Sequence, residues 1–157
     1  MLRHAQHDII RFKFKYENYN GCDFVILQDL KKINMSAEIR ALEPKALWNK
    51  FADLNAVPRP SKKEGRVIKF MKDFGVQLGL ETIEDEVGNV IIRKPATSGM
   101  EDRKPIVMQS HLDMVHQKNN NTVFDFDNQG IEMLVDGDWV KAKGTTLGAD
   151  NGLGVAT

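Results

Sequence analysis

One histidine and two aspartates stand out in the sequence because their types and spacing suit a metal site. His111 and Asp113 directly follow an apolar run, and Asp150 comes later within the sequence Gly-Ala-Asp-Asn-Gly. Side chains alternate across a strand, so a strand that ends in His111 and Asp113 points both the same way. Imidazole and carboxylate together suit zinc, manganese or cobalt better than calcium or magnesium. The three residues therefore predict a site for zinc or a similar metal.

Each of the three residues has its own predicted role. If the folded chain brings His111 and Asp150 together, both are metal ligands, and the two oxygens of Asp150 can bridge a pair of ions. Asp113 has the spacing to accept the other imidazole N–H of His111, which fixes the tautomer and raises the basicity of the ring. His-x-Asp is also typical of a strand-end histidine bonded to a nearby carboxylate, so a purely structural pair stays open.

The composition is that of a globular protein with one domain of ordinary size. The chain has 157 residues, of which 41% are hydrophobic. Its 22 basic and 22 acidic residues balance, which argues against nucleic acid or an anionic membrane as a partner and favours a small molecule. No apolar run approaches the roughly 18 residues of a membrane span. The single cysteine, Cys22, cannot form an internal disulfide, so we expect a cytoplasmic protein.

Local patterns predict the elements that position these residues. Apolar residues at helical spacing predict a helix from Pro44 to Leu54, which ends before two prolines. A longer helix is expected after Ser61, which with Glu64 has the pattern of a capping box. The other expected elements are strands at 82–85, 90–92 and 106–109, a hairpin over 131–143 around Asp136-Gly137, and the start of a helix within 144–154.

These elements predict an α/β fold with a largely parallel mixed sheet flanked by helices. The short apolar strand 106–109 is of the kind that is buried in such a sheet. The glycines of 144–154 are not a phosphate loop, because no Gly-Lys-Ser/Thr follows them, and a flexible turn is an alternative interpretation. Residues 1–34 show no sustained period, so we expect an atypical N-terminal extension, with Met35 as the natural start.

Longer stretches around the three residues resemble a known family. They are Gln-Ser-His-Leu-Asp-Met-Val at 109–115, Gln-Lys-Asn-Asn at 117–120, Lys-Gly-Thr-Thr-Leu-Gly-Ala-Asp-Asn-Gly at 143–152, and Pro-Arg-Pro-Ser at 58–61. The chain is similar to the aminoacyl-histidine dipeptidases, also called Xaa-His or cytosolic non-specific dipeptidases or peptidase D, of the dinuclear zinc peptidase clan. The resemblance covers 35–157, so this range is expected to be the N-terminal part of the peptidase catalytic domain.

The resemblance implies a fold, a reaction and residue roles. It implies that His111 binds one zinc ion, that Asp150 bridges two, and that Asp113 is the catalytic residue that orients or tunes His111. The implied reaction is hydrolysis of an unblocked dipeptide, of Xaa-His or broad specificity, by a zinc-activated water. Two zinc ions, or cobalt or manganese in their place, and a homodimer are implied for the complete enzyme.

The sequence departs from the family in what it lacks. The family's general base and another ligand are adjacent glutamates after the Ala-Asp-Asn-Gly motif, followed by an aspartate and a final histidine, and none of these matches this chain. A helix-ending signal is also missing before Thr157, so we expect a truncated and inactive fragment. Two alternatives stay open: a tripeptidase or acyl-amino-acid deacylase of the same clan, and a non-catalytic truncated product.

Overall fold

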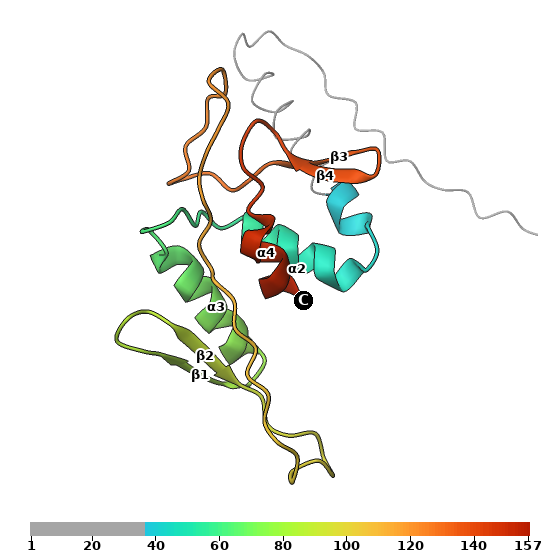
Figure 1. The fold of residues 1–157 in the computed structure, drawn as a ribbon, viewed down its shortest axis with the longest axis vertical. Coiled ribbons are helices and arrows are strands. Elements are labelled where there is room, and N and C mark those ends of the chain that lie inside the picture. The colour runs from blue at the N-terminus through green and yellow to red at the C-terminus, as the bar shows by residue number, and fades with distance from the viewer. Residues whose placement is uncertain (1–36) are drawn as a thin grey trace, which may run out of the picture.

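The computed structural model describes residues 37–157, and the predictions for 1–34 and for Met35 lie outside this range. Figure 1 shows the helices and strands along the chain. They are α2 (Lys45–Asn55), α3 (Gly65–Gln77), β1 (Glu81–Glu84), β2 (Val90–Arg93), β3 (Met133–Asp136), β4 (Trp139–Ala142) and α4 (Ala149–Ala156). This mixture of helices and strands confirms the α/β class. None of the helices described is long and apolar enough to cross a membrane.

Helix α2 forms where helical spacing predicted it, and it carries the centre of the hydrophobic core. Phe51 and Leu54 are buried on the same face of α2. Phe51 joins a core cluster with Met133 of β3 and Ala156 of α4. Helices α2 and α4 pack directly against each other, as Figure 1 shows near the C-terminus. The core therefore joins α2 to α4, the helix whose first turn contains Asp150.

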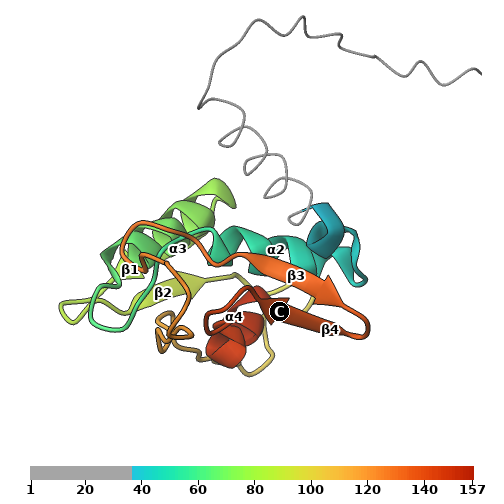
Figure 2. The ribbon, with the colours of Figure 1, turned by 90° about the horizontal axis from the view of Figure 1, so that it is seen from above.

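Helix α3 packs on the hairpin β1–β2. The two strands, which the sequence predicted at 82–85 and 90–92, pair antiparallel, with Glu81 opposite Arg93. Gly75 of α3 lies so close to Thr82 that a Cβ at this position would collide with its hydroxyl. In the view of Figure 2, α2 and α3 run along one side of the molecule, with β1–β2 beneath α3 and β3–β4 beneath α2.

The predicted hairpin over 131–143 is confirmed as β3–β4. Met133 lies opposite Ala142 and Asp136 opposite Trp139, so the turn falls at Gly137, as expected from Asp-Gly. Gly137 has a φ of +59°, in the left-handed region that a side chain disfavours. The turn at Gly137 therefore determines the register of β3 and β4.

The parallel sheet and its strand at 106–109 are not present in residues 37–157. The sheets described are two antiparallel pairs, β1–β2 and β3–β4, and parallel pairing is limited to one bridge between Pro60 and Met114. Ile106, Val107 and Met108 are between 83% and 91% exposed. A strand needs the backbone N–H and C=O groups of a neighbour, and no described segment pairs with 106–109. The apolar run alone was therefore a misleading signal.

The capping-box prediction at Ser61 is also wrong. The residue before α3 is Glu64, and no side chain caps the helix. The carboxylate of Glu64 accepts from the backbone N–H of Lys62. The Ser61 hydroxyl donates instead to Asp113 Oδ2, at 2.7 Å, so a tertiary contact has replaced the local one.

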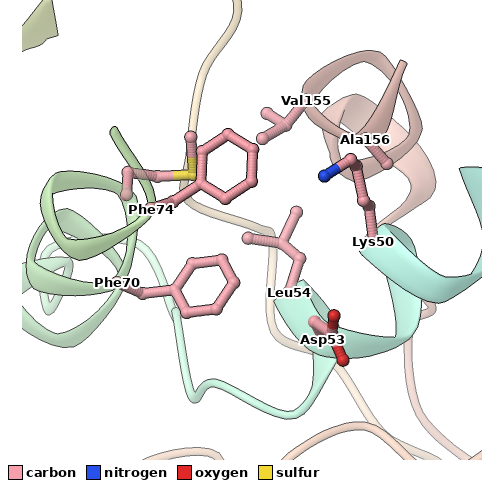
Figure 3. A pocket seen from close by; sticks show the side chains of 8 residues that line it. Lys50, Asp53, Leu54, Phe70, Phe74, Val155 and Ala156 are labelled. Atoms are coloured by element: carbon pink, nitrogen blue, oxygen red, sulfur yellow. The ribbon is translucent and has the colours of Figure 1, made fainter. Parts of the chain in front are cut away.

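An apolar pocket lies between α2, α3 and α4, as Figure 3 shows. Leu54, Phe70 and Phe74 line it, with Val155 and Ala156 of α4 facing them. The Lys50 ammonium lies 4.4 Å from the centre of the Phe74 ring, a cation–π contact. None of His111, Asp113 and Asp150 lines this pocket. The candidate metal site must therefore be found elsewhere.

Candidate metal site

The fold brings together the three residues that the sequence singled out. His111 Nδ1 lies 3.0 Å from Asp113 Oδ1 and 3.1 Å from the backbone carbonyl oxygen of Asp113. On the other side of the ring, His111 Nε2 lies 3.1 Å from Asp150 Oδ1. The fold thus brings His111 and Asp150 into contact, although they lie 39 residues apart in the sequence. The imidazole stands between two carboxylates.

The loop that carries His111 and Asp113 is held by a short parallel bridge. The Met114 N–H donates to the Arg59 carbonyl at 3.0 Å, and the Ser61 N–H donates to the Met114 carbonyl at 3.2 Å. These bonds run along the segment that connects α2 to α3. His111 and Asp113 therefore meet through this bridge and a compact loop, since the strand predicted to deliver them is not formed.

Asp150 reaches the site from the start of α4. The residue before this helix, Gly148, has a φ of +70°, a left-handed conformation that glycine adopts without steric cost. Asp150 itself has non-helical torsions, φ −91° and ψ 106°. Its side chain is 97% exposed, so its carboxylate stands at the surface beside His111. The site therefore opens to solvent on the Asp150 side.

Asp113 is held in place by Ser61. Its Oδ2 accepts the Ser61 hydroxyl, while its Oδ1 faces His111 Nδ1. The Ser61 hydrogen bond is the main reason why the pKa of Asp113 lies below its usual range, with the bond to His111 adding to it. Asp113 is therefore ionised at neutral pH and accepts from the imidazole on a fixed side.

The two carboxylates also determine the charge state that the imidazole prefers. Hydrogen bonding to Asp150 is the main cause that raises the pKa of His111 above its usual value, and Asp113 adds to it. Carboxylate and carbonyl oxygens only accept, so Nδ1 must carry a hydrogen toward Asp113. A bare lone pair on Nε2 would face the Asp150 oxygen and repel it. The space between Nε2 and Asp150 therefore suits a positive charge, either a proton or a metal cation.

The spacing of these two donor atoms fits one metal ion. Tetrahedral zinc with Zn–N and Zn–O bonds of about 2.0–2.2 Å places adjacent ligand atoms about 3.3–3.6 Å apart. His111 Nε2 and Asp150 Oδ1 are 3.1 Å apart, which is close to that separation. Within residues 37–157, no group of three or more His, Cys, Asp or Glu side chains is arranged to hold a metal. The described residues therefore offer two donors at a separation that fits zinc.

The remaining histidine of the described range, His116, does not belong to this cluster. It is exposed, and its ring makes an edge-on contact with Phe126 at a centroid distance of 5.6 Å. This exposure places His116 at the surface, outside the candidate site. It also makes His116 a useful control for His111.

Sequence reasoning missed two residues that support the site, Ser61 and Arg59. Ser61 was interpreted as a helix cap, and Arg59 was noted only as part of the Pro-Arg-Pro-Ser motif. Arg59 is 1% exposed, and this burial lowers the pKa of its guanidinium to about 10, which still leaves it charged at neutral pH. A charged residue between two prolines was the one available signal for Arg59.

Comparisons with known proteins agree with the motifs. No protein-family model matches the chain. Over 121 residues, 77% of this chain and 25% of the relative, it is 50% identical to the cytosol non-specific dipeptidase of Escherichia coli (strain K12). The crystal structure of aminoacylhistidine dipeptidase from Vibrio alginolyticus matches with a TM-score of 0.73 and 47% identity, over 75% of this chain and 24% of that one. The chain spans about a quarter of the length of these relatives and is similar, over that part, to the cytosol non-specific and aminoacylhistidine dipeptidases.

Proposed function

We propose that this chain contributes His111 and Asp150 as zinc ligands to a centre that hydrolyses dipeptides. The observation that carries the proposal is the arrangement around one ring. His111 Nδ1 faces Asp113, and Nε2 faces Asp150 at a separation that suits two ligands of one ion. The names of both relatives supply the reaction, because each is a dipeptidase.

A bound zinc ion supplies Lewis acidity, which polarises a carbonyl and makes water a good nucleophile at neutral pH. The chain's own residues prepare its place. Asp113 accepts the Nδ1 hydrogen and so leaves the Nε2 lone pair free to bind. Ser61 fixes the second oxygen of Asp113, which keeps the imidazole plane from turning. Cobalt or manganese suits the same imidazole and carboxylate donors.

The exposure of Asp150 supports a role in bridging. Only one of its oxygens is engaged by His111, and its side chain is 97% exposed. The other oxygen is therefore open to a second ion or to ligands from other residues. The substrate in this proposal is a dipeptide, either Xaa-His or of broader type. The proposed location is the cytosol, which the name of the Escherichia coli relative gives for that protein.

A zinc titration of the metal-free chain tests the proposal. Zinc is added to ¹⁵N-labelled chain, and the imidazole nitrogens are followed by NMR. We expect Nε2 of His111 to shift on binding, and we expect His111→Ala and Asp150→Ala each to weaken binding by at least tenfold. His116→Ala is the matched control and should bind like the unchanged chain. Equal affinity in all four proteins would refute zinc ligation by this pair.

A further inference from the structure

Two buried polar residues at the end of α2 connect the two loops that carry the candidate ligands. Asn55 is the last residue of α2, and Arg59 follows one helical turn later in sequence. Both are 1% exposed, and they are the two buried polar or charged residues of the described range. The Asn55 side-chain oxygen accepts from Arg59 Nη2 at 2.8 Å. The two side chains thus act as one unit.

The Arg59 guanidinium holds both loops at once. Its Nη1 donates to the carbonyl of Leu112 at 3.1 Å and, more weakly, to that of Asp113 at 3.4 Å. Its Nη2 donates to the carbonyl of Gly148 at 2.8 Å. Leu112 lies between His111 and Asp113, and Gly148 lies two residues before Asp150. One rigid planar group therefore spans the two segments whose ligands must meet.

Asn55 adds a second bond to the later loop. Its Nδ2 donates to the carbonyl of Leu147 at 3.1 Å, one residue before the Gly148 carbonyl that Arg59 binds. Asn55 and Arg59 therefore fix two successive carbonyls ahead of Asp150. We call Asn55 and Arg59 together the α2 clamp.

The glycines around Asp150 leave room for this clamp. A Cβ at Gly148 would lie 2.5 Å from Arg59 Nη2, and a Cβ at Gly152 would lie 2.6 Å from the same atom. Both distances are well below contact distance. The glycine-rich stretch is thus packed on Arg59, which contradicts its interpretation as a flexible turn.

A buried guanidinium is a costly way to stabilise a fold, because an apolar side chain of similar volume fills the same space without desolvating a charge. Its Nε has no hydrogen-bond partner here, which adds to that cost. What the guanidinium offers, and an apolar side chain does not, is directional bonding to both loops. We propose that the α2 clamp sets the separation of His111 and Asp150 and thereby acts as the positioning device of the metal site. This inference rests on the proposed zinc ligation.

The test measures zinc affinity in clamp variants of the full chain. Arg59→Lys keeps the positive charge but loses the fork that reaches both loops. Asn55→Ala removes both the bond to Leu147 and the bond from Arg59 Nη2, and it keeps the guanidinium that bonds the two loops. We expect each to weaken zinc binding about 10- to 100-fold, the range typical of residues that orient metal ligands. Arg66→Lys, at an exposed arginine that bonds the Asp127 carbonyl, is the matched control and should bind zinc normally.

Loss of stability alone must be separated from loss of positioning. Val67→Ala removes buried methyl groups from α3, a helix that contains neither clamp residue, and should lower Tm while leaving zinc affinity unchanged. Gly152→Ala keeps the Arg59 side chain but places a methyl group 2.6 Å from its Nη2 and 2.8 Å from a ring carbon of Phe51, so it should weaken zinc binding even if Arg59→Lys fails to fold. The Arg59 Nη protons should give separate, slowly exchanging NMR signals that broaden in Asn55→Ala.

The outcomes distinguish this inference from the proposed function. In one outcome, His111→Ala and Asp150→Ala weaken zinc binding, but the variants Arg59→Lys, Asn55→Ala and Gly152→Ala bind zinc like the unchanged chain. That outcome refutes the positioning role of the α2 clamp and supports zinc ligation by His111 and Asp150. If His111→Ala and Asp150→Ala themselves bind zinc normally, the proposed ligation fails, and the clamp inference fails with it. Weakened binding in the clamp variants, with normal binding in Arg66→Lys and Val67→Ala, is the supporting result.

Discussion

The hydroxyl of Ser61 donates a 2.7 Å hydrogen bond to Asp113, and Asp113 in turn faces the imidazole of His111. Ser61, which lies 52 positions before Asp113 in the sequence, thus orients His111 through the Asp113 carboxylate. The histidine's other nitrogen faces Asp150. The site is therefore a row of four side chains that begins at Ser61 and ends at the solvent-exposed carboxylate of Asp150.

Ser61→Ala should release Asp113 without removing any proposed ligand. The pKa of Asp113 should rise toward its usual value, because the Ser61 hydrogen bond is the main cause of its depression. Zinc affinity should fall about tenfold, at the lower end of the range for residues that orient ligands. A ¹³C NMR titration of the Asp113 carboxyl and a zinc titration check both effects. Ser98→Ala, in an exposed loop, is the control, and an Asp113 pKa unchanged by Ser61→Ala contradicts the role of Ser61.

Asp150→Asn should lower the pKa of His111 in the metal-free chain. Asp150 is the main cause of the raised pKa, and an amide stabilises the imidazolium less than a carboxylate does. A raised pKa means that the folded chain binds this proton more tightly than the unfolded chain. The stabilisation is therefore fully present below about pH 6.5 and is lost as the pH rises through the raised value. NMR titration of the imidazole measures the pKa, and the same value in both proteins would count against the His111–Asp150 contact.

Zinc binding should depend on pH in the opposite direction. The metal competes with the proton on Nε2, so its affinity should fall as the pH decreases through the pKa of His111. Because Asp150 raises that pKa, the decrease should begin at a higher pH than for an unperturbed histidine. Zinc titrations at a series of pH values check this. An affinity that is constant across the titration of His111 contradicts ligation by its imidazole.

Leu54→Ala should destabilise the fold by about 2–5 kcal/mol, because it removes a fully buried side chain and leaves a cavity. Leu54 is 1% exposed on the face of α2 that carries the core. Val123→Ala is the matched control: Val123 is 99% exposed, so its loss should change the free energy of unfolding by no more than about 0.5 kcal/mol. Urea unfolding measures both, and equal effects would contradict the assigned core.

The polypeptide 1–157 by itself should not hydrolyse dipeptides at a measurable rate. Its described residues offer two converging metal donors and no third. A general base contributes about 10²- to 10⁴-fold and must lie within hydrogen-bond reach of the attacking water. Asp113 has both of its carboxylate oxygens engaged, one by Ser61 and the other by His111. Zinc-dependent release of histidine from a dipeptide by the purified chain, abolished in His111→Ala, would contradict this prediction.

Elements encoded by local patterns could be predicted from the sequence. Helix α2 follows from apolar residues one turn apart, and hairpin β3–β4 follows from Asp-Gly between two strand-forming runs. The pairing of His111 with Asp113 was also predictable from a spacing of two residues. The prediction was correct although the strand behind it is absent, because the loop itself brings the two side chains together.

Features that depend on distant contacts could not be predicted. The run 106–109 has strand-forming residues, but a strand also requires a neighbour, which a local pattern does not show. The Ser61 hydroxyl could cap α3 or bond Asp113, and the local sequence does not distinguish the two. In the folded chain it bonds Asp113. The role of Arg59 depends on the backbone carbonyls of Leu112 and Gly148. Every residue has a backbone carbonyl, so the residue types at these positions do not indicate the contact.

The most direct measurement of the central claim is X-ray absorption of the zinc-loaded chain. We expect one imidazole and otherwise oxygen ligands at about 2.0–2.2 Å, with the imidazole signature lost in His111→Ala and kept in His116→Ala. That result would place His111 on the metal. An imidazole signature that persists in His111→Ala, or that disappears in His116→Ala, would contradict the claim that His111 and Asp150 form the metal site.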